Sequence, residues 1–210
     1  MRLVVLGAAG GTGRLVVERA ITAGHEVTAV ARDCEALARL RLRSTVVRAD
    51  VLEPETLRAP IEGADAVVYA VAPPNRSTTV VYSEGIRNLL ETMRDSGVKR
   101  LLTITSSRIE VPREAPLTRK LVIRYLIEKI FRNPYLDMLR MEDELRHSDM
   151  NWTMVRSAKL RDGTEIGRYR TVINGYLPRE RPLNRADLAE FLVTHIDDAD
   201  TFRAEVSISG

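Results

Sequence analysis

The sequence predicts an α/β fold, a doubly wound parallel sheet with a small C-terminal region, on three observations. Short apolar runs alternate with helical patterns along the chain, which is typical of βαβ units. A glycine-rich segment separates the first apolar run from the first helical pattern. The 210 residues are 44% hydrophobic and 29% charged, an ordinary balance for a globular protein that excludes overall disorder.

The first half of the chain contains four predicted strands. They are short apolar runs at residues 2–6, 26–31, 45–48 and 66–71. Helical patterns connect them and lead to the next strand, at residues 12–23, 35–40, 55–61 and 79–96. This regular alternation predicts parallel strands with helices on both faces of the sheet.

The second half departs from this rhythm. A fifth strand is predicted at 101–105 and a sixth at 152–155, where we expect the main sheet to be complete. The segment between them, 117–147, is mainly helical and is interrupted at Asn133-Pro134. A short strand, a helix and a last strand follow at 168–173, 185–196 and 205–208. Without repeats or a linker, residues 1–210 are interpreted as one domain.

The glycine-rich segment Gly7-Ala-Ala-Gly10-Gly11-Thr12-Gly13 joins the first strand to the first helix. Glycine lets the backbone turn tightly and approach a ligand closely, and the free N–H groups at a helix start favour negative charge. The segment therefore predicts a site for the pyrophosphate of a dinucleotide. The alternative is a glycine-rich turn that binds nothing.

The end of the second strand bears on the choice of dinucleotide. Arg32 and Asp33 stand there side by side. A guanidinium pairs with a 2′-phosphate, whereas a carboxylate accepts hydrogen bonds from a ribose 2′-hydroxyl. We favour NADP over NAD, since Asp33 can equally cap the short helix that follows. The alternative for Arg32 is a solvated arginine at a strand end.

Two further strand ends belong to the same expected site. Asp50-Val51 follows the third strand, where a carboxylate near the adenine is expected, although Asp50 can also cap a helix. Ala70-Val71-Ala72 ends the fourth strand with small side chains. Their size leaves room for a ribose and a nicotinamide beside the backbone.

Composition excludes several other classes of function. The net charge of +3 comes from 32 basic and 29 acidic residues that are interspersed, so no nucleic-acid surface is predicted. No run approaches the ~18 apolar residues of a membrane span. The single cysteine and three scattered histidines have no metal-ligand spacing, so we expect no metal. These observations favour a cytoplasmic protein, a monomer or homodimer, with a small-molecule substrate.

Four later segments extend the pattern: Ser83-Glu-Gly-Ile-Arg-Asn88, Gly97-Val98, Thr105-Ser-Ser107 and Asn151-Trp-Thr-Met-Val-Arg156. With the segments above, they resemble the atypical short-chain dehydrogenase/reductases, and most of all the NAD(P)H-binding proteins related to biliverdin-IXβ reductase, also called flavin reductase. The resemblance runs nearly end to end. It implies a Rossmann sheet that binds NADPH.

The resemblance also implies roles for individual residues. It places Arg32 at the 2′-phosphate, Asp50-Val51 near the adenine, and Ser106 beside the nicotinamide. The other implied contacts to the cofactor are Thr12, Gly13 and Arg14 around the phosphates, and Thr105, Ser107 and Lys159 toward the nicotinamide. The regions that face the substrate are then mainly 108–150 and 157–184.

One departure concerns the Tyr-x-x-x-Lys pair, with which typical members of the superfamily transfer a proton. Tyr125 and Lys129 have the required spacing, but they lie in a basic apolar segment before Asn133-Pro134. Tyr135 is better placed relative to Trp152, yet Leu139 stands where the lysine is expected. We prefer Tyr135 as the tyrosine that faces the site, which makes hydride transfer with a proton from solvent more plausible than alcohol dehydrogenation.

The function predicted from the sequence is reduction of a planar conjugated or carbonyl small molecule, such as a flavin or quinone, by NADPH. Ser106 and Tyr135 are the candidate catalytic residues. Two alternatives stay open: a regulatory protein that senses NADP without catalysis, and an isomerase or cyclase that retains the cofactor.

Overall fold

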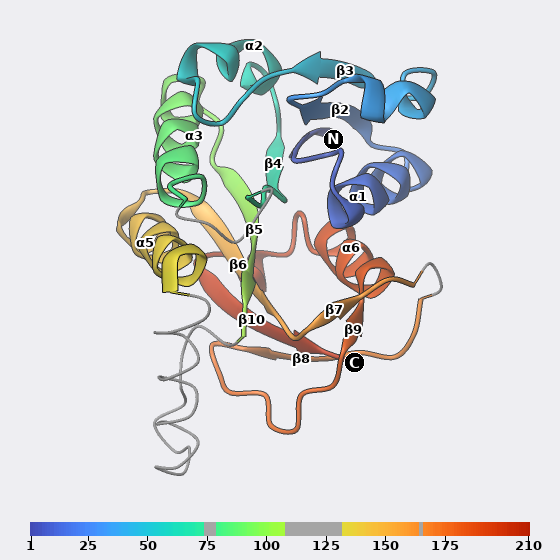
Figure 1. Ribbon diagram of the computed structural model, residues 1–210, viewed down its shortest axis with the longest axis vertical. Coiled ribbons are helices and arrows are strands. Elements are labelled where there is room, and N and C mark those ends of the chain that lie inside the picture. The colour runs from blue at the N-terminus through green and yellow to red at the C-terminus, as the bar shows by residue number, and fades with distance from the viewer. Residues whose placement is uncertain (74–78, 108–131, 164–165) are drawn as a thin grey trace.

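The computed structural model describes residues 1–73, 79–107, 132–163 and 166–210 (Figure 1). Its strands are β1 Arg2–Leu6, β2 Glu26–Ala31, β3 Thr45–Arg48, β4 Ala66–Tyr69, β5 Arg100–Ser106, β6 Asn151–Ser157, β7 Leu160–Arg161, β8 Arg170–Ile173, β9 Leu183–Asn184 and β10 Ala204–Ser209. Its helices are α1 Gly11–Thr22, α2 Arg58–Ile61, α3 Ser83–Asp95, α5 Arg132–His147 and α6 Arg185–Thr194, with short 3-10 helices at Glu35–Leu40, Pro54–Thr56 and Ala199–Thr201.

The main sheet has the strand order β3-β2-β1-β4-β5-β6-β10-β8. The first six strands are parallel and follow the order of a doubly wound Rossmann sheet, in which the order reverses between β1 and β4. Val5 of the central strand pairs with Ala29 on one side and Val68 on the other. The carboxyl ends of β1, β2 and β4 therefore meet at one edge of the sheet.

Helices cover both faces, which is why the central strands are continuous runs of valine, leucine and alanine. Figure 1 shows α1 beside α6 on one side of the sheet and α3 beside α5 on the other. Val16 and Phe191 belong to the core on the first side, and Ile86 and Met141 to the core on the second. All four side chains are buried.

The sixth strand does not complete the sheet. β10 pairs with β6 in parallel, and β8 then pairs with β10 antiparallel at the edge. The expectation of a sheet complete at β6 was wrong because Val206 and Ile208 of β10 supply the apolar surface that α6 packs against. A further pair, β7 with β9, consists of strands too short to give a sequence pattern.

Helix α3 begins at Ser83, later than the apolar pattern from residue 79 predicts. Asp137 of α5 accepts hydrogen bonds from the backbone N–H groups of Tyr82 at 2.8 Å and Ser83 at 3.2 Å, and also from the Ser83 hydroxyl. A buried carboxylate from a distant helix thus caps α3, which has no cap of its own.

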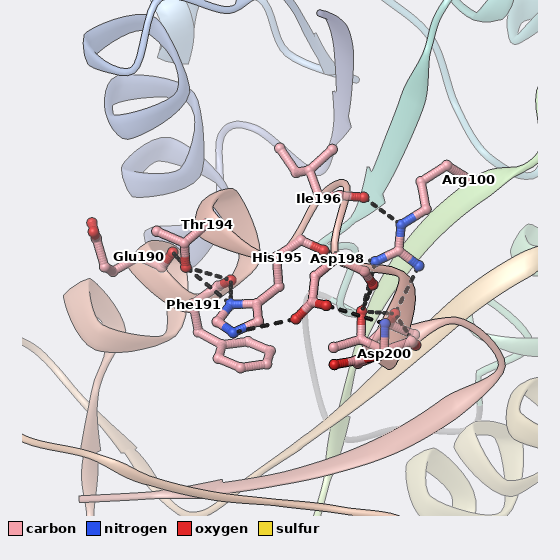
Figure 2. Close-up of polar contacts among 10 residues, drawn as sticks. Arg100, Glu190, Phe191, Thr194, His195, Ile196, Asp198 and Asp200 are labelled. Carbon is pink, nitrogen blue, oxygen red and sulfur yellow. Dashed lines mark hydrogen bonds and ion pairs between the residues drawn. The ribbon is translucent and has the colours of Figure 1, made fainter.

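Arg100, the first residue of β5, anchors the amino ends of the parallel strands. Its buried guanidinium donates to the carbonyl oxygens of Ile196 at 2.5 Å, His195 at 2.8 Å and Asn151 at 2.8 Å. Figure 2 shows this side chain pointing toward the turn that follows α6. Burial lowers the pKa of Arg100 to about 10, and it remains charged at neutral pH. Arg100 therefore joins β5, β6 and the turn after α6.

Candidate functional site

A cavity of about 540 Å³ opens at the edge where the carboxyl ends of β1, β2 and β4 meet. This is the switch point at which doubly wound folds bind ligands. Its described lining comprises Leu6, Gly7, Ala9, Gly10, Val30, Ala31, Arg32, Asp33, Ala49, Asp50, Val51, Ala70, Val71, Ala72 and Val81. Eight of the predicted cofactor residues line this one cavity: Gly7, Gly10, Arg32, Asp50, Val51, Ala70, Val71 and Ala72.

The glycine-rich turn has the geometry expected of a phosphate-binding turn. Gly7 has a φ of 80°, and a Cβ at this position would lie 2.6 Å from the carbonyl oxygen of Ala70. A Cβ on Gly13 would collide with the carbonyl oxygen of Gly7. Only glycine permits these approaches. The turn brings the start of α1 directly against β1 and β4.

The start of α1 suits a negatively charged group. Gly10 precedes the helix, no side chain caps it, and its first turn contains no acidic residue. The buried Thr12 lies in that turn, whereas Arg14 is exposed and donates to the carbonyl oxygen of Ala36 at 3.4 Å. Free N–H groups at a helix start attract phosphate, so this turn fits the diphosphate of a dinucleotide.

Arg32 and Asp33 have different partners. The Asp33 carboxylate accepts the backbone N–H of Glu35 at 2.9 Å, so it stabilises the turn into the next helix. The Arg32 side chain is 59% exposed, and its guanidinium lies 4.0 Å from Asp50. Such an exposed, weakly paired cation remains available to a ligand phosphate.

Asp50 and Val51 form the wall next to Arg32. The Asp50 carboxylate accepts the backbone N–H of Leu52 at 3.0 Å, as a turn-forming aspartate does. Asn88 of α3 donates from its amide to the carbonyl oxygen of Val51 at 2.9 Å. These bonds fix the loop after β3 against α3, with the largely buried Val51 at the cavity.

The far wall is made by the residues that follow β4 and by Val81, two residues before α3. Ala70, Val71 and Ala72 present small side chains to the cavity. The phenol of Tyr69 donates to the carbonyl oxygen of Val81 at 2.8 Å, which holds that segment in place. Burial raises the pKa of Tyr69 well above its ordinary value, so this phenol keeps its proton.

Thr105 and Ser106 end β5, the strand that pairs with β4, and Ser107 follows them. None of these three predicted residues belongs to the described cavity lining. Thr105 is 2% exposed, and its hydroxyl has no hydrogen-bond partner among the described residues. Ser106 is half-buried, and the hydroxyl of Ser107 donates to Glu180 at 2.9 Å. Ser106 is therefore the more accessible of the two side chains that end the strand.

Tyr135 lies in the first turn of α5 and is half-buried, close enough to Tyr82 to affect its titration. Burial, the Asp137 carboxylate and Tyr135 together raise the pKa of Tyr82 to about 12. Leu139, one turn after Tyr135, offers no charge. The alternative pair, Tyr125 and Lys129, lies outside the described residues.

Lys159 is exposed, and its carbonyl oxygen accepts the backbone N–H of Leu183 at 3.0 Å. It therefore stands where the chain passes from β6 into the small β7–β9 pair.

Sequence reasoning missed several cavity residues, including Val30, Ala31, Ala49 and Val81. The first three end or follow predicted parallel strands, and that position was the available signal.

The described residues contain neither a metal-binding cluster nor a helix that could cross a membrane. No group of three or more histidine, cysteine, aspartate or glutamate side chains there could hold a metal ion. Within the same ranges, no helix combines the length and apolar character needed to cross a membrane.

Several known proteins resemble this chain in sequence. Photosystem II assembly factor Ycf39 of Synechocystis is 32% identical over 141 residues, which cover 65% of this chain and 42% of that protein. The chain spans 33% to 61% of the length of four curated relatives that it matches.

Two solved structures resemble the whole chain. A short-chain dehydrogenase/reductase from Veillonella parvula, in complex with NADP, superposes with a TM-score of 0.80 at 15% identity over 100% of this chain and 94% of that one. ChuY, an anaerobillin reductase from Escherichia coli O157:H7, gives 0.76 at 17% identity over 100% and 97%. A family model described as NAD(P)H-binding matches residues 7–199. The chain belongs to this NAD(P)H-binding family and has a Rossmann fold.

Proposed function

We propose that the protein is an NADPH-dependent reductase that transfers a hydride to a planar conjugated or carbonyl small molecule, such as a flavin or quinone. The observation that carries the proposal is the cavity at the switch point. It combines a glycine turn that fits a diphosphate with an exposed arginine and with small side chains that leave room for a flat ring. The anaerobillin reductase among the structural relatives supports the reductase class.

The preference for NADPH over NADH follows from the different partners of Arg32 and Asp33. The Asp33 carboxylate already accepts the Glu35 N–H, so it is less available to a ribose hydroxyl. Arg32 lines the same cavity with a guanidinium that can pair with a 2′-phosphate. The relative solved with NADP is consistent with this preference.

NADPH, when bound, supplies the hydride. The protein holds the substrate against it and excludes water, so positioning accounts for most of its contribution. We assign Ser106 to orienting the substrate and the Tyr135 hydroxyl to donating a proton to the reduced product. Since Leu139 replaces the usual lysine, solvent must restore the proton on Tyr135.

A direct test mixes the purified protein with NADPH and, in turn, FMN, a quinone and an aldehyde, while the absorbance of the reduced nicotinamide is followed. We expect oxidation with at least one acceptor, and faster oxidation with NADPH than with NADH. Tyr135→Phe should lower kcat at saturating NADPH, whereas Tyr169→Phe, which alters a ring packed on Phe191, should not. Tight binding of NADPH without oxidation of any acceptor would refute the reductase proposal.

A second candidate function is a binding protein that senses NADP and acts on a partner protein. Two observations favour it: Leu139 stands in place of the catalytic lysine, and one sequence relative is an assembly factor. Binding without turnover in the test above would support it. For either function we propose a cytoplasmic monomer or homodimer that binds a small molecule and neither nucleic acid nor membrane.

A further inference from the structure

The first residue of α6 lies against the phosphate-binding turn, although some 170 residues separate them in the chain. A Cβ on Gly11, the first residue of α1, would lie 3.2 Å from both Cδ and Nε of Arg185 and 3.9 Å from Cζ. The Cδ and Nε atoms of Arg185 therefore lie against the start of α1. A Cβ at position 11 would require the Arg185 side chain to shift by a few tenths of an ångström.

This is an unfavourable place for a cation. α1 and α6 pack side by side, and Gly11 and Arg185 are their first residues (Figure 1). The start of a helix carries a partial positive charge, so a guanidinium between two such starts is repelled by both. A negative group is needed to compensate it.

The structure supplies only a weak compensating charge among its described residues. Asp162, after β7, accepts from Nη1 of Arg185 at 2.6 Å. Its side chain is 98% exposed, and an ion pair of this kind contributes little because water screens it. The Arg185 side chain is 29% exposed and lies against the turn in the absence of a ligand.

We propose that Arg185 binds the diphosphate of the dinucleotide beside Gly11 of the glycine turn, exchanging Asp162 for phosphate oxygens. The inference rests on the cofactor site of the proposed function. A guanidinium presents a planar fork of donors that matches phosphate geometry, and here its position is set in advance by Gly11 and Asp162. Asp162 acts as the placeholder that keeps the fork over the turn.

The proposal distinguishes Arg185 from Arg32 by the ligand group that each contacts. Both NADPH and NADH contain the diphosphate, so Arg185 should contribute equally to the binding of both. Arg32 should contribute only to ligands with a 2′-phosphate. ADP-ribose carries the diphosphate without the 2′-phosphate, which makes it the diagnostic probe.

The experiment measures the Kd of ADP-ribose, NADH and NADPH by calorimetry for the full chain and its variants. Arg185→Gln should weaken all three ligands by a similar factor, about tenfold or more. Arg185→Lys should recover part of this loss because it restores the charge without the fork. The control is Arg94→Gln, which removes an exposed arginine paired with the exposed Asp149 at the other edge of the sheet and should change no Kd.

Two results would overturn the proposal. In one, Arg185→Gln binds ADP-ribose as tightly as Arg94→Gln does. In the other, Asp162→Asn weakens ADP-ribose as much as Arg185→Gln does, which would show that the ion pair maintains the loop and not the phosphate site. Thermal unfolding without ligand tests whether each variant is folded. These results are independent of turnover, so a protein that binds NADPH without oxidising it leaves the role of Arg185 intact.

Discussion

Arg32 and Asp33 are neighbours in sequence but differ in what their side chains can offer a ligand. Arg32→Gln should weaken NADPH by about tenfold or more, because a hydrogen bond to a charged group contributes roughly 1.5–3 kcal/mol. The Kd of NADH should change little, since that ligand has no 2′-phosphate. Fluorescence titration of the variant with both nucleotides measures the ratio.

The matched control for this change is Arg39→Gln, which removes an exposed arginine from the 3-10 helix after β2, outside the cavity lining. It should leave both dissociation constants unchanged. Equal weakening of NADH and NADPH by Arg32→Gln would contradict the assignment of Arg32 to the 2′-phosphate.

The buried phenol of Tyr82 leads to a prediction about how the unfolding free energy depends on pH. Its pKa is raised from 10.0 to about 12 in the folded protein, chiefly by burial. The folded state therefore holds this proton more tightly than the unfolded chain does, so the stabilisation is complete below pH 10 and is lost as the pH rises toward 12. Tyr82→Phe should show a shallower fall in unfolding free energy over this range. Identical slopes in urea titrations of both proteins would contradict the prediction.

At the scale of elements, buried charges fix α5 to the sheet. Glu142 of α5 is 0% exposed and contacts Arg156 of β6 at 2.7 Å and Arg146 at 2.9 Å. Both arginines also contact Glu205 of β10, at 2.8 Å and 2.7 Å respectively. Tyr135 lies seven residues before Glu142, two turns along the same face of the helix. The network thus fixes the helix that carries Tyr135 against β6 and β10.

Glu142→Gln should lower the unfolding free energy by about 3 kcal/mol, because it leaves the buried Arg156 with one carboxylate in place of two. Urea denaturation measures this loss. The control, Glu144→Gln on the same helix, removes an exposed pair with Arg87 and should cost about 1 kcal/mol or less. Equal losses in the two variants would refute a special role for the buried network.

Sequence patterns predicted the existence and type of most elements, because a strand buried on both faces must be a continuous apolar run. They did not predict where α3 begins, since its cap is Asp137, which is 54 residues beyond Ser83 in the chain. They also missed β7 and β9, which have two residues each. What the sequence left undetermined thus depends on contacts between distant segments.

At the scale of the whole molecule, Arg100 joins the two halves of the chain at the edge opposite the cavity. Arg100→Leu should lower the unfolding free energy by about 3 kcal/mol or more, because it leaves buried carbonyl oxygens and the hydroxyls of Thr153 and Thr201 without this donor. Thermal or urea unfolding measures the loss.

Lys99→Gln is the control for Arg100, since it removes the neighbouring cation, whose pair with Asp149 is exposed. It should cost about 1 kcal/mol or less. If Arg100→Leu is no more harmful than this variant, the proposed anchor does not exist.

Most residues of the candidate site could be predicted from local sequence patterns, but one that depends on packing between distant segments could not. The glycine turn, Arg32, Asp50 and the end of β4 were predictable, because each follows a parallel strand and such ends meet at one edge. Arg185 was not, because no local pattern in its segment indicates that it rests on Gly11. Its position results from the packing of α6 on α1.

The walls of the cavity and the layer that supports them are made at different times on the ribosome. The described lining comes from residues 6–81, whereas α6, which covers the apolar face of α1, comes from Arg185–Thr194. A nascent chain therefore contains the cavity residues long before Val16, Val17 and Ala20 of α1 can be buried against α6. Until α6 has been synthesised, α1 presents an apolar surface of the kind that chaperones bind.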